Sequence, residues 1–205
     1  MLFTPEQLFL SPPFFRIAGP VKQQFRLRLE IGNLGADDAH TYFIDHVLPT
    51  FVHPPCDEKT WARVYSVCGG NAGQLLHCAA LAAACRDWEQ SCQSLVREAA
   101  GDISRALSPS TWDGAAWTAD DCRTVLHMIA SSPHAAVSVA QLGAALGEDG
   151  SNKLQSMNKL NLLLRRSYDP LARDIDAAAF GPELEDVYTL PSAAHIIAAK
   201  RKLNL

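Results

Sequence analysis

Two adjacent glycines, Gly69 and Gly70, separate two stretches of helical sequence. Before them, apolar residues recur at the spacing of one helix face, and glycine at such a point favours a helix end. After them, Asn71 is a residue type that caps helix N-termini, and Leu75 begins a new apolar face. The same alternation of helical period and stop signal recurs along most of the chain, so the sequence predicts a mainly α fold.

The chain divides into three predicted regions. Residues 1–31 form a poorly defined N-terminal segment, in which only residues 25–31 alternate charged and apolar side chains as a half-buried strand does. That strand is expected to pair with a later strand at residues 187–190 or with another chain, or to be poorly ordered. Residues 32–108 are expected to form a helical domain, and residues 117–205 a second domain after a connector that contains Pro109.

The second domain has a distinctive order of predicted elements. Thr118 and Asp121 form a capping box before a helix, and Ser138 begins a shorter helix. A turn bracketed by Gly147 and Gly150 follows, then a helix over residues 151–164, an extended loop, a short strand and a closing helix. This order is typical of a winged helix-turn-helix module with a short β wing.

Composition limits the classes of function. The formal charge is −4, so the whole chain has no basic field that would attract nucleic acid. No apolar run approaches the roughly 20 residues of a membrane helix, and no membrane partner is expected. The six cysteines include Cys78, Cys85 and Cys92, seven residues apart in helical sequence, and lack zinc-ligand spacing. Buried free thiols predict a reducing compartment, the cytoplasm or nucleus.

Motifs for catalysis are absent from the sequence. No Gly-Lys pair is present, although a phosphate-binding P-loop needs one, and no apolar strand ends in paired acids that would hold Mg²⁺. Gly-x-Ser-x-Gly and His-Glu-x-x-His are also absent. We therefore expect no catalytic residues, no metal site and no enzyme activity of the isolated chain.

Two segments carry a resemblance to a known family. They read Leu-Glu-Ile-Gly-Asn-Leu-Gly-Ala-Asp-Asp-Ala over residues 29–39 and Val-Cys-Gly-Gly-Asn-Ala-Gly-Gln-Leu over residues 67–75. Their order and spacing resemble the strand-to-lid junction and the lid turn of archaeal-type ATPases in the STAND branch of the AAA+-like P-loop NTPases. In that family the lid continues into a winged helix.

The resemblance covers the chain from about residue 25 onward and implies a lid and winged-helix portion without the nucleotide-binding core. Gly35 stands where the family usually has Ser, and Ala72 where it has Pro. By resemblance, Gly69, Gly70, Asn71 and Ala72 form a turn that faces the adenine, with ATP bound only if the missing core is supplied elsewhere. The alternative is a plain helix end followed by a helix cap.

Cations gather in one predicted helix. Residues 151–166 contain four cations and no acid: Lys153, Lys159, Arg165 and Arg166. A helix exposing such charges could contact DNA phosphates or a partner. The next stretch, residues 168–186, contains six acids and one arginine, which would repel a DNA backbone.

Three functions follow from these patterns. The leading hypothesis is a non-catalytic regulatory or protein-interaction module with a protein partner. The first alternative is a DNA-binding winged-helix regulator that uses the helix from Ser151. The second is an ATPase subunit or fragment whose nucleotide-binding core belongs to another chain or to a longer gene product.

Overall fold

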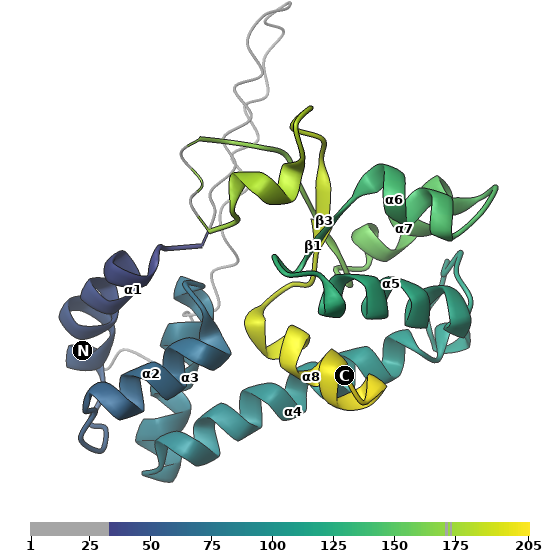
Figure 1. Ribbon diagram of the computed structural model, residues 1–205. Helices are drawn as coiled ribbons and strands as arrows, with labels where there is room; N and C mark the ends of the chain where they lie inside the picture. The colour runs from purple at the N-terminus through teal and green to yellow at the C-terminus, as the bar shows by residue number, and fades with distance from the viewer. Residues whose placement is uncertain (1–32, 171, 173) are drawn as a thin grey trace, which may run out of the picture.

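The computed structural model describes residues 33–170, 172 and 174–205. The strand predicted at residues 25–31 and the rest of the N-terminal segment lie outside these residues. The described part is mainly helical, with one small three-stranded antiparallel sheet (Figure 1). The prediction of a mainly α fold is confirmed.

The first half consists of helices joined by short turns. They are α1 (Ala36–Tyr42), which continues through a π-helical turn (Phe43–Val47) and a 3₁₀ turn (Leu48–Thr50), then α2 (Glu58–Cys68), α3 (Ala72–Cys85) and α4 (Trp88–Ala106). The inner face of this first helical segment is buried, at Ala39, Phe43 and Val47. Burial of each large apolar side chain contributes about 1.5–3 kcal/mol, so this face fixes α1 against the bundle.

Side-chain caps define where α2, α3 and α4 begin. Asp57, Asn71 and Asp87 accept a hydrogen bond from the backbone N–H three residues on, at 2.8, 2.9 and 3.1 Å. Between α3 and α4 the chain reverses at Arg86, which has a left-handed φ of 60°. Because of this reversal, Cys78 and Cys85 lie on α3 and Cys92 lies on α4, so two helices contribute the heptad-spaced cysteines.

The second half contains the sheet. Its elements are a 3₁₀ turn (Pro109–Thr111), α5 (Ala119–Ser131), β1 (Ala136–Ser138), α6 (Val139–Ala145), α7 (Gly150–Lys159), β2 (Leu164–Arg166), a 3₁₀ turn (Ala177–Phe180), β3 (Val187–Thr189) and α8 (Ala193–Leu203). The strand order is β1-β3-β2. Thr189 pairs with Ala136 on one side and Leu164 on the other. β3 is therefore the central strand, with a hydrogen-bonded neighbour on both sides.

Helix α7 ends earlier than predicted. It stops at Lys159 rather than near residue 164, and Arg165 and Arg166 lie on β2 instead of on the helix. The stop is a Schellman motif: Asn161 has a left-handed φ of 56°, and the Leu162 N–H bonds the Met157 carbonyl at 3.0 Å. Asparagine tolerates this conformation better than other non-glycine residues, so Asn161 is the signal that ends the helix.

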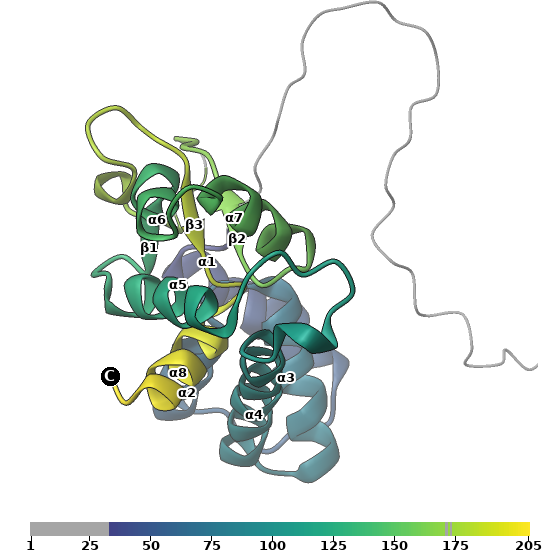
Figure 2. The same cartoon turned by 90° about the vertical axis from the view of Figure 1, so that its right-hand side faces the viewer.

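The last helix joins the two halves. Helix α8 packs mainly against α4, and also against α5 and α2 (Figures 1 and 2). Buried side chains from α1 to α8 form one continuous hydrophobic cluster, which includes Phe43, Leu95, Ile129 and Ala198. The packing makes the C-terminal residues part of both halves, and the predicted boundary between residues 108 and 117 stays a prediction.

Candidate functional site

The turn at Gly69–Asn71 is held by close backbone contacts. Gly69 ends α2 with a φ of 58° and donates its N–H to the Tyr65 carbonyl at 2.7 Å. The Gly70 carbonyl accepts the Leu34 N–H at 2.8 Å, and a Cβ at Gly70 would lie 1.8 Å from the Leu34 carbonyl oxygen. Only glycine permits this approach. Leu34 and Gly70, one from each segment that carries the family resemblance, are therefore adjacent in space.

The same turn adjoins the last helix. A Cβ at Gly69 would lie 3.7 Å from the Ala193 Cβ at the start of α8. The Asn71 side chain is engaged as the α3 cap, and Ala72 is exposed in the first turn of that helix. These contacts give Gly69, Gly70 and Asn71 structural roles. The nucleotide-facing role that the resemblance implies stays a prediction.

Lys153 lies on the inner side of α7. Its Nζ donates to Asp121 Oδ1 at 2.9 Å and to the Leu146 carbonyl at 3.2 Å, and its side chain is 22% exposed. Burial alone would raise the pKa of Asp121, but hydrogen bonds from Lys153 and Thr118 outweigh it and hold that pKa below its ordinary value. Thr118 and Asp121 form the capping box that the sequence predicts. Lys153 thus stabilises the helix bundle.

The two arginines of β2 are also paired with acids. Arg166 bonds Asp174 through both terminal nitrogens, at 3.0 and 2.9 Å, and the two side chains are 14% and 6% exposed. Arg165 Nε donates to Asp186 Oδ2 at 2.7 Å. The acidic loop after β2 therefore folds back and neutralises the cations that precede it.

Apolar contacts also hold part of the acidic loop between β2 and β3 in place. Phe180 is buried with Ala136 and Val187 in a small separate cluster, and the Tyr168 ring meets Phe180 edge-on at 5.5 Å. These contacts hold the loop against the sheet, close to the strand whose arginines its acids neutralise.

Lys159 differs from the other three predicted contact residues. It is exposed, and in the described residues it has no ion pair. Ser151, Asn152 and Gln155 share its exposed helix face. The face of α7 that reaches solvent is therefore polar, with a single lysine, rather than strongly basic.

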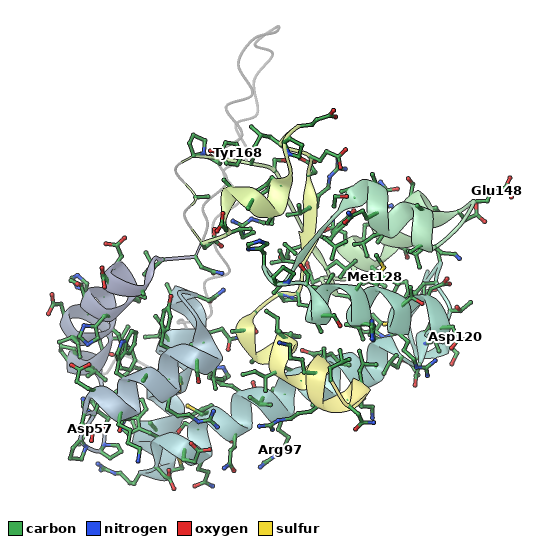
Figure 3. The ribbon with its side chains drawn as sticks, in the orientation of Figure 1. Asp57, Arg97, Asp120, Met128, Glu148 and Tyr168 are labelled. Atoms are coloured by element: carbon green, nitrogen blue, oxygen red, sulfur yellow. The ribbon has the colours of Figure 1, made fainter. Side chains whose placement is uncertain are left out.

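A second cationic surface lies between α2, α4 and α8. A groove of about 480 Å³ is lined by Arg63, Arg97, Arg201 and Lys202, with Val96 and Ala198 among its apolar residues. We call it the α2–α4–α8 groove. Figure 3 shows Arg97 projecting outward from α4. Four cations from three helices thus line one groove whose remaining lining is partly apolar.

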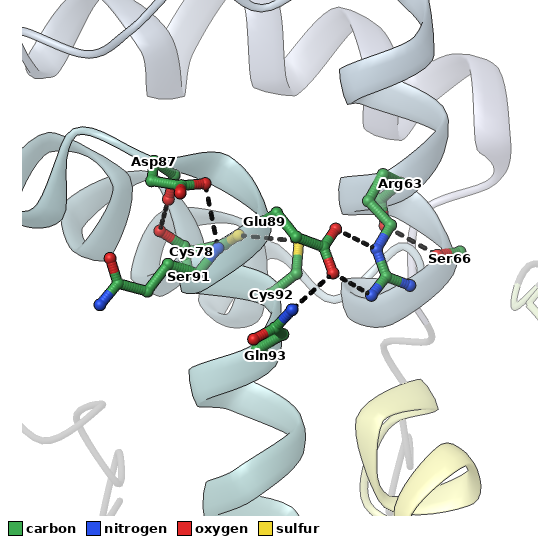
Figure 4. A network of polar contacts seen from close by, with 9 residues as sticks. Arg63, Ser66, Cys78, Asp87, Glu89, Ser91, Cys92 and Gln93 are labelled. Carbon is green, nitrogen blue, oxygen red and sulfur yellow. Dashed lines mark hydrogen bonds and ion pairs between the residues drawn. The ribbon is translucent and has the colours of Figure 1, made fainter.

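The acid in this groove, Glu89, is fully engaged (Figure 4). Arg63 donates to both of its oxygens at 2.8 Å, and Gln93 Nε2 donates at 3.0 Å. These bonds, first from Arg63 and then from Gln93, lower the pKa of Glu89 to about 2. Within residues 33–170, 172 and 174–205, Arg97, Arg201 and Lys202 have no ion pair, so the groove keeps a positive charge.

Sequence reasoning did not find the groove. Its residues are separated by long stretches of chain, and only the run Lys200, Arg201 and Lys202 is visible as a local signal. Cations in the last turn of a helix are commonly explained by the helix dipole alone. The contribution of Arg63 and Arg97 becomes visible only once α8 is placed across α4.

The thiols form no metal centre in the part of the chain that the structure describes. All six cysteines are free, and Cys78 Sγ lies 3.9 Å from Cys92 Sγ in the core. No group of three or more His, Cys, Asp or Glu side chains among the described residues is arranged to hold a metal ion. In the same residues, no helix has the length and hydropathy required to cross a bilayer.

Comparisons with known proteins add no relative. No protein-family model, no curated protein and no solved structure matches this chain.

Proposed function

We propose that the chain is a non-catalytic regulatory or protein-interaction module, similar to the lid and winged-helix portion of a STAND-type ATPase. Its contact surface is the α2–α4–α8 groove, and its partner presents an acidic segment with apolar side chains. The observation that carries this proposal is the charge of the groove: Arg97, Arg201 and Lys202 are exposed and have no ion pair among the described residues.

The order of elements supports the assignment of residues 117–205 as a winged helix. Helix, strand, two helices and two further strands follow one another, and the last strand lies between the other two. The packing of α8 on α4 and α2 supports a module whose winged-helix part rests on its lid. A partner that binds the groove would contact both parts at once.

The groove suits an acidic peptide better than a nucleic acid. Ala100 is partly exposed in the groove, and Val96 and Ala198, both largely buried, complete its apolar lining. Apolar surface of this kind accepts the apolar face of an amphipathic segment. A phosphate backbone offers charge without apolar side chains and is bound by arrays of cations along its path. The groove therefore provides the two kinds of contact that an acidic, partly apolar segment needs.

DNA binding is the second candidate, and the exposed face of α7 favours it. Asn152 and Gln155 carry amide groups of the type that bond the edge of adenine, and Lys159 can contact a phosphate. The pairing of Lys153, Arg165 and Arg166 with acids of the chain opposes it, because those cations are engaged.

The third candidate is an ATPase subunit whose core lies elsewhere. For the isolated chain we expect no ATP hydrolysis, because the sequence has neither the Gly-Lys pair of a P-loop nor an apolar strand that ends in paired acids for Mg²⁺. Purified protein with ATP and Mg²⁺ is expected to release phosphate no faster than buffer. Turnover that persists through rigorous purification contradicts the non-catalytic assignment.

Binding of two labelled probes separates the first two candidates. The probes are a short peptide of Glu and Leu and a DNA duplex, both titrated at low salt and followed by fluorescence anisotropy. We expect the peptide to bind, and the double variant Arg97→Glu, Arg201→Glu to weaken it at least tenfold. Lys159→Glu is the matched control, a charge reversal on an exposed helix face outside the groove.

Two outcomes of these titrations would contradict the proposal. Submicromolar duplex binding that is lost in Lys159→Ala would establish the DNA-binding candidate instead. Peptide binding that is equally weakened by Lys159→Glu would mean attraction to net charge and not to the groove.

A further inference from the structure

A second hollow lies in the interior, where the two halves meet. It has a volume of about 200 Å³ and is enclosed by α4, α5, α7 and the start of α8. Its apolar walls include Ile103, Ala106, Val125, Met157 and Leu163, all buried. The cavity is separate from the α2–α4–α8 groove, since the two share no residue.

The polar groups at the edge of the cavity already have partners. His195 Nδ1 lies 2.8 Å from Ser192 Oγ, and His195 Nε2 lies 3.3 Å from Asp102 Oδ2. The other Asp102 oxygen accepts from Arg105. The hydroxyl can therefore donate to Nδ1 while Nε2–H donates to the carboxylate, so neutral imidazole satisfies both contacts. Burial lowers the pKa of His195, against the opposing effect of Asp102, and this favours the neutral ring.

One polar side chain at the edge stays available. Asn161 lines the cavity and is exposed, which places it on the solvent side. Its side-chain amide has no hydrogen bond to any described residue, although its backbone N–H is used in the turn that ends α7. Asparagine offers both a donor and an acceptor.

We propose that this cavity is a binding site for a small neutral aromatic molecule of one or two rings, with one hydrogen-bonding group directed to Asn161. An apolar cavity of about 150 Å³ in another protein is large enough for benzene, so a volume of about 200 Å³ admits a ring with a substituent. A ligand in this position touches helices of both halves and so couples their packing.

The surroundings exclude charged ligands. A carboxylate inside would lie among apolar walls, and the nearby Arg105 is engaged by Asp102. A cation would compete with Arg105 and His195 for the same carboxylate. Burying a charge without a free partner is costly, so neutral molecules are selected over ions of the same size.

Thermal unfolding of the whole chain with two probes tests this site. Indole is neutral and has one N–H, whereas benzoate is of similar size but charged. At ten times its dissociation constant, indole is expected to raise Tm by about 3–6 °C, and benzoate at equal concentration by less than about 1 °C. In ¹⁵N-labelled protein, indole is expected to shift the amide signals of Ile103 and Leu163 and to leave those of α3 in place.

Filling the cavity supplies the matched variants. Ala106→Leu places a larger side chain in the space and is expected to abolish the indole-dependent rise in Tm. Ala84→Leu makes the same change at an exposed position of α3 and is expected to preserve it. If Ala106→Leu does not fold, Ala106→Val fills less of the space and is expected to weaken indole at least threefold.

Any of three results overturns the proposal. These are no indole effect on the unmodified chain, equal effects of indole and benzoate, or an effect that survives unchanged in the folded Ala106 variant.

Discussion

Cations occur in two settings in this protein. On α7 and β2, Lys153, Arg165 and Arg166 each contact an acid of the same chain, and Arg166 is almost covered. In the α2–α4–α8 groove, Arg97 and Arg201 have no ion pair among the described residues, and the carboxylate of Glu89 in the same groove is bound by Arg63. The first region holds the more conspicuous cluster in the sequence, yet the second retains the charge.

The difference shows why charge along a sequence is a weak guide to a binding surface. The partner of Lys153 lies 32 positions away, and that of Arg165 lies 21 positions away. Such ion pairs stabilise the fold, and they also neutralise the positive charge that the cations would otherwise present at the surface. The capacity to attract a ligand depends on cations without partners, which can come from distant helices.

The largest expected effect tests the covered pair on β2. Asp174→Ala removes two charge-assisted hydrogen bonds from Arg166, whose side chain is only 14% exposed, and we expect the free energy of unfolding to fall by about 3 kcal/mol. Urea denaturation measures this change. Asp120→Ala is the control, because the Asp120 side chain is 89% exposed and its contact with Arg123 is expected to contribute less than about 0.5 kcal/mol. Equal losses in the two variants would contradict the distinction between covered and exposed pairs.

A smaller effect is expected at Asp121. Asp121→Ala removes the partner of Lys153 and half of the capping box, and we expect a loss of about 1–2 kcal/mol. Because the pKa of Asp121 is lower in the folded chain, its contribution is present above the ordinary value of 3.8 and is lost as pH falls through the folded value.

Denaturation at pH 7 and at pH 3 measures this linkage. The difference in stability between the parent and Asp121→Ala is expected to shrink at the lower pH. A difference that does not change with pH would mean that the charge of Asp121 contributes nothing to the pair with Lys153.

The smallest expected effect lies in the groove. Glu89→Gln removes its acid and releases Arg63, so affinity for the Glu and Leu peptide is expected to rise about two- to threefold. Stability is expected to change by less than about 1 kcal/mol, since both side chains are partly exposed. Glu98→Gln, an exposed position of α4 outside the groove lining, is the control. A fall in peptide affinity in Glu89→Gln would argue against the groove as the contact surface.

Local signals predicted much of the fold. Asn71 as a cap, the pair Thr118 and Asp121, and the turn at Gly147 act over a few residues, and each occurs as the pattern indicates. The end of α7 was predicted wrongly because leucines continue past Asn161 and suggest a longer helix. The left-handed conformation of Asn161 ends the helix, and the leucines after it lie in a turn and at the start of β2.

The candidate sites were less accessible to prediction. β1 has only three residues, too few to establish a period, and its identity depends on pairing with β3. The partners of Lys153 and Arg166 and the walls of the cavity are set by how helices pack. No spacing within the sequence encodes such contacts, because they join segments that no local rule relates.

The buried thiols of Cys78 on α3 and Cys92 on α4 can report how often these two helices separate. A hydrogen bond with Cys68, together with burial, raises the pKa of Cys78. A hydrogen bond with Cys78 and, to a smaller extent, burial raise the pKa of Cys92. Neither side chain is exposed, whereas Cys85 is partly accessible. Alkylation of Cys85 therefore reports the chemistry of the reagent, and alkylation of Cys78 and Cys92 reports how often the two helices separate. The unmodified chain thus carries a probe of its own opening rate, with a reference thiol built in.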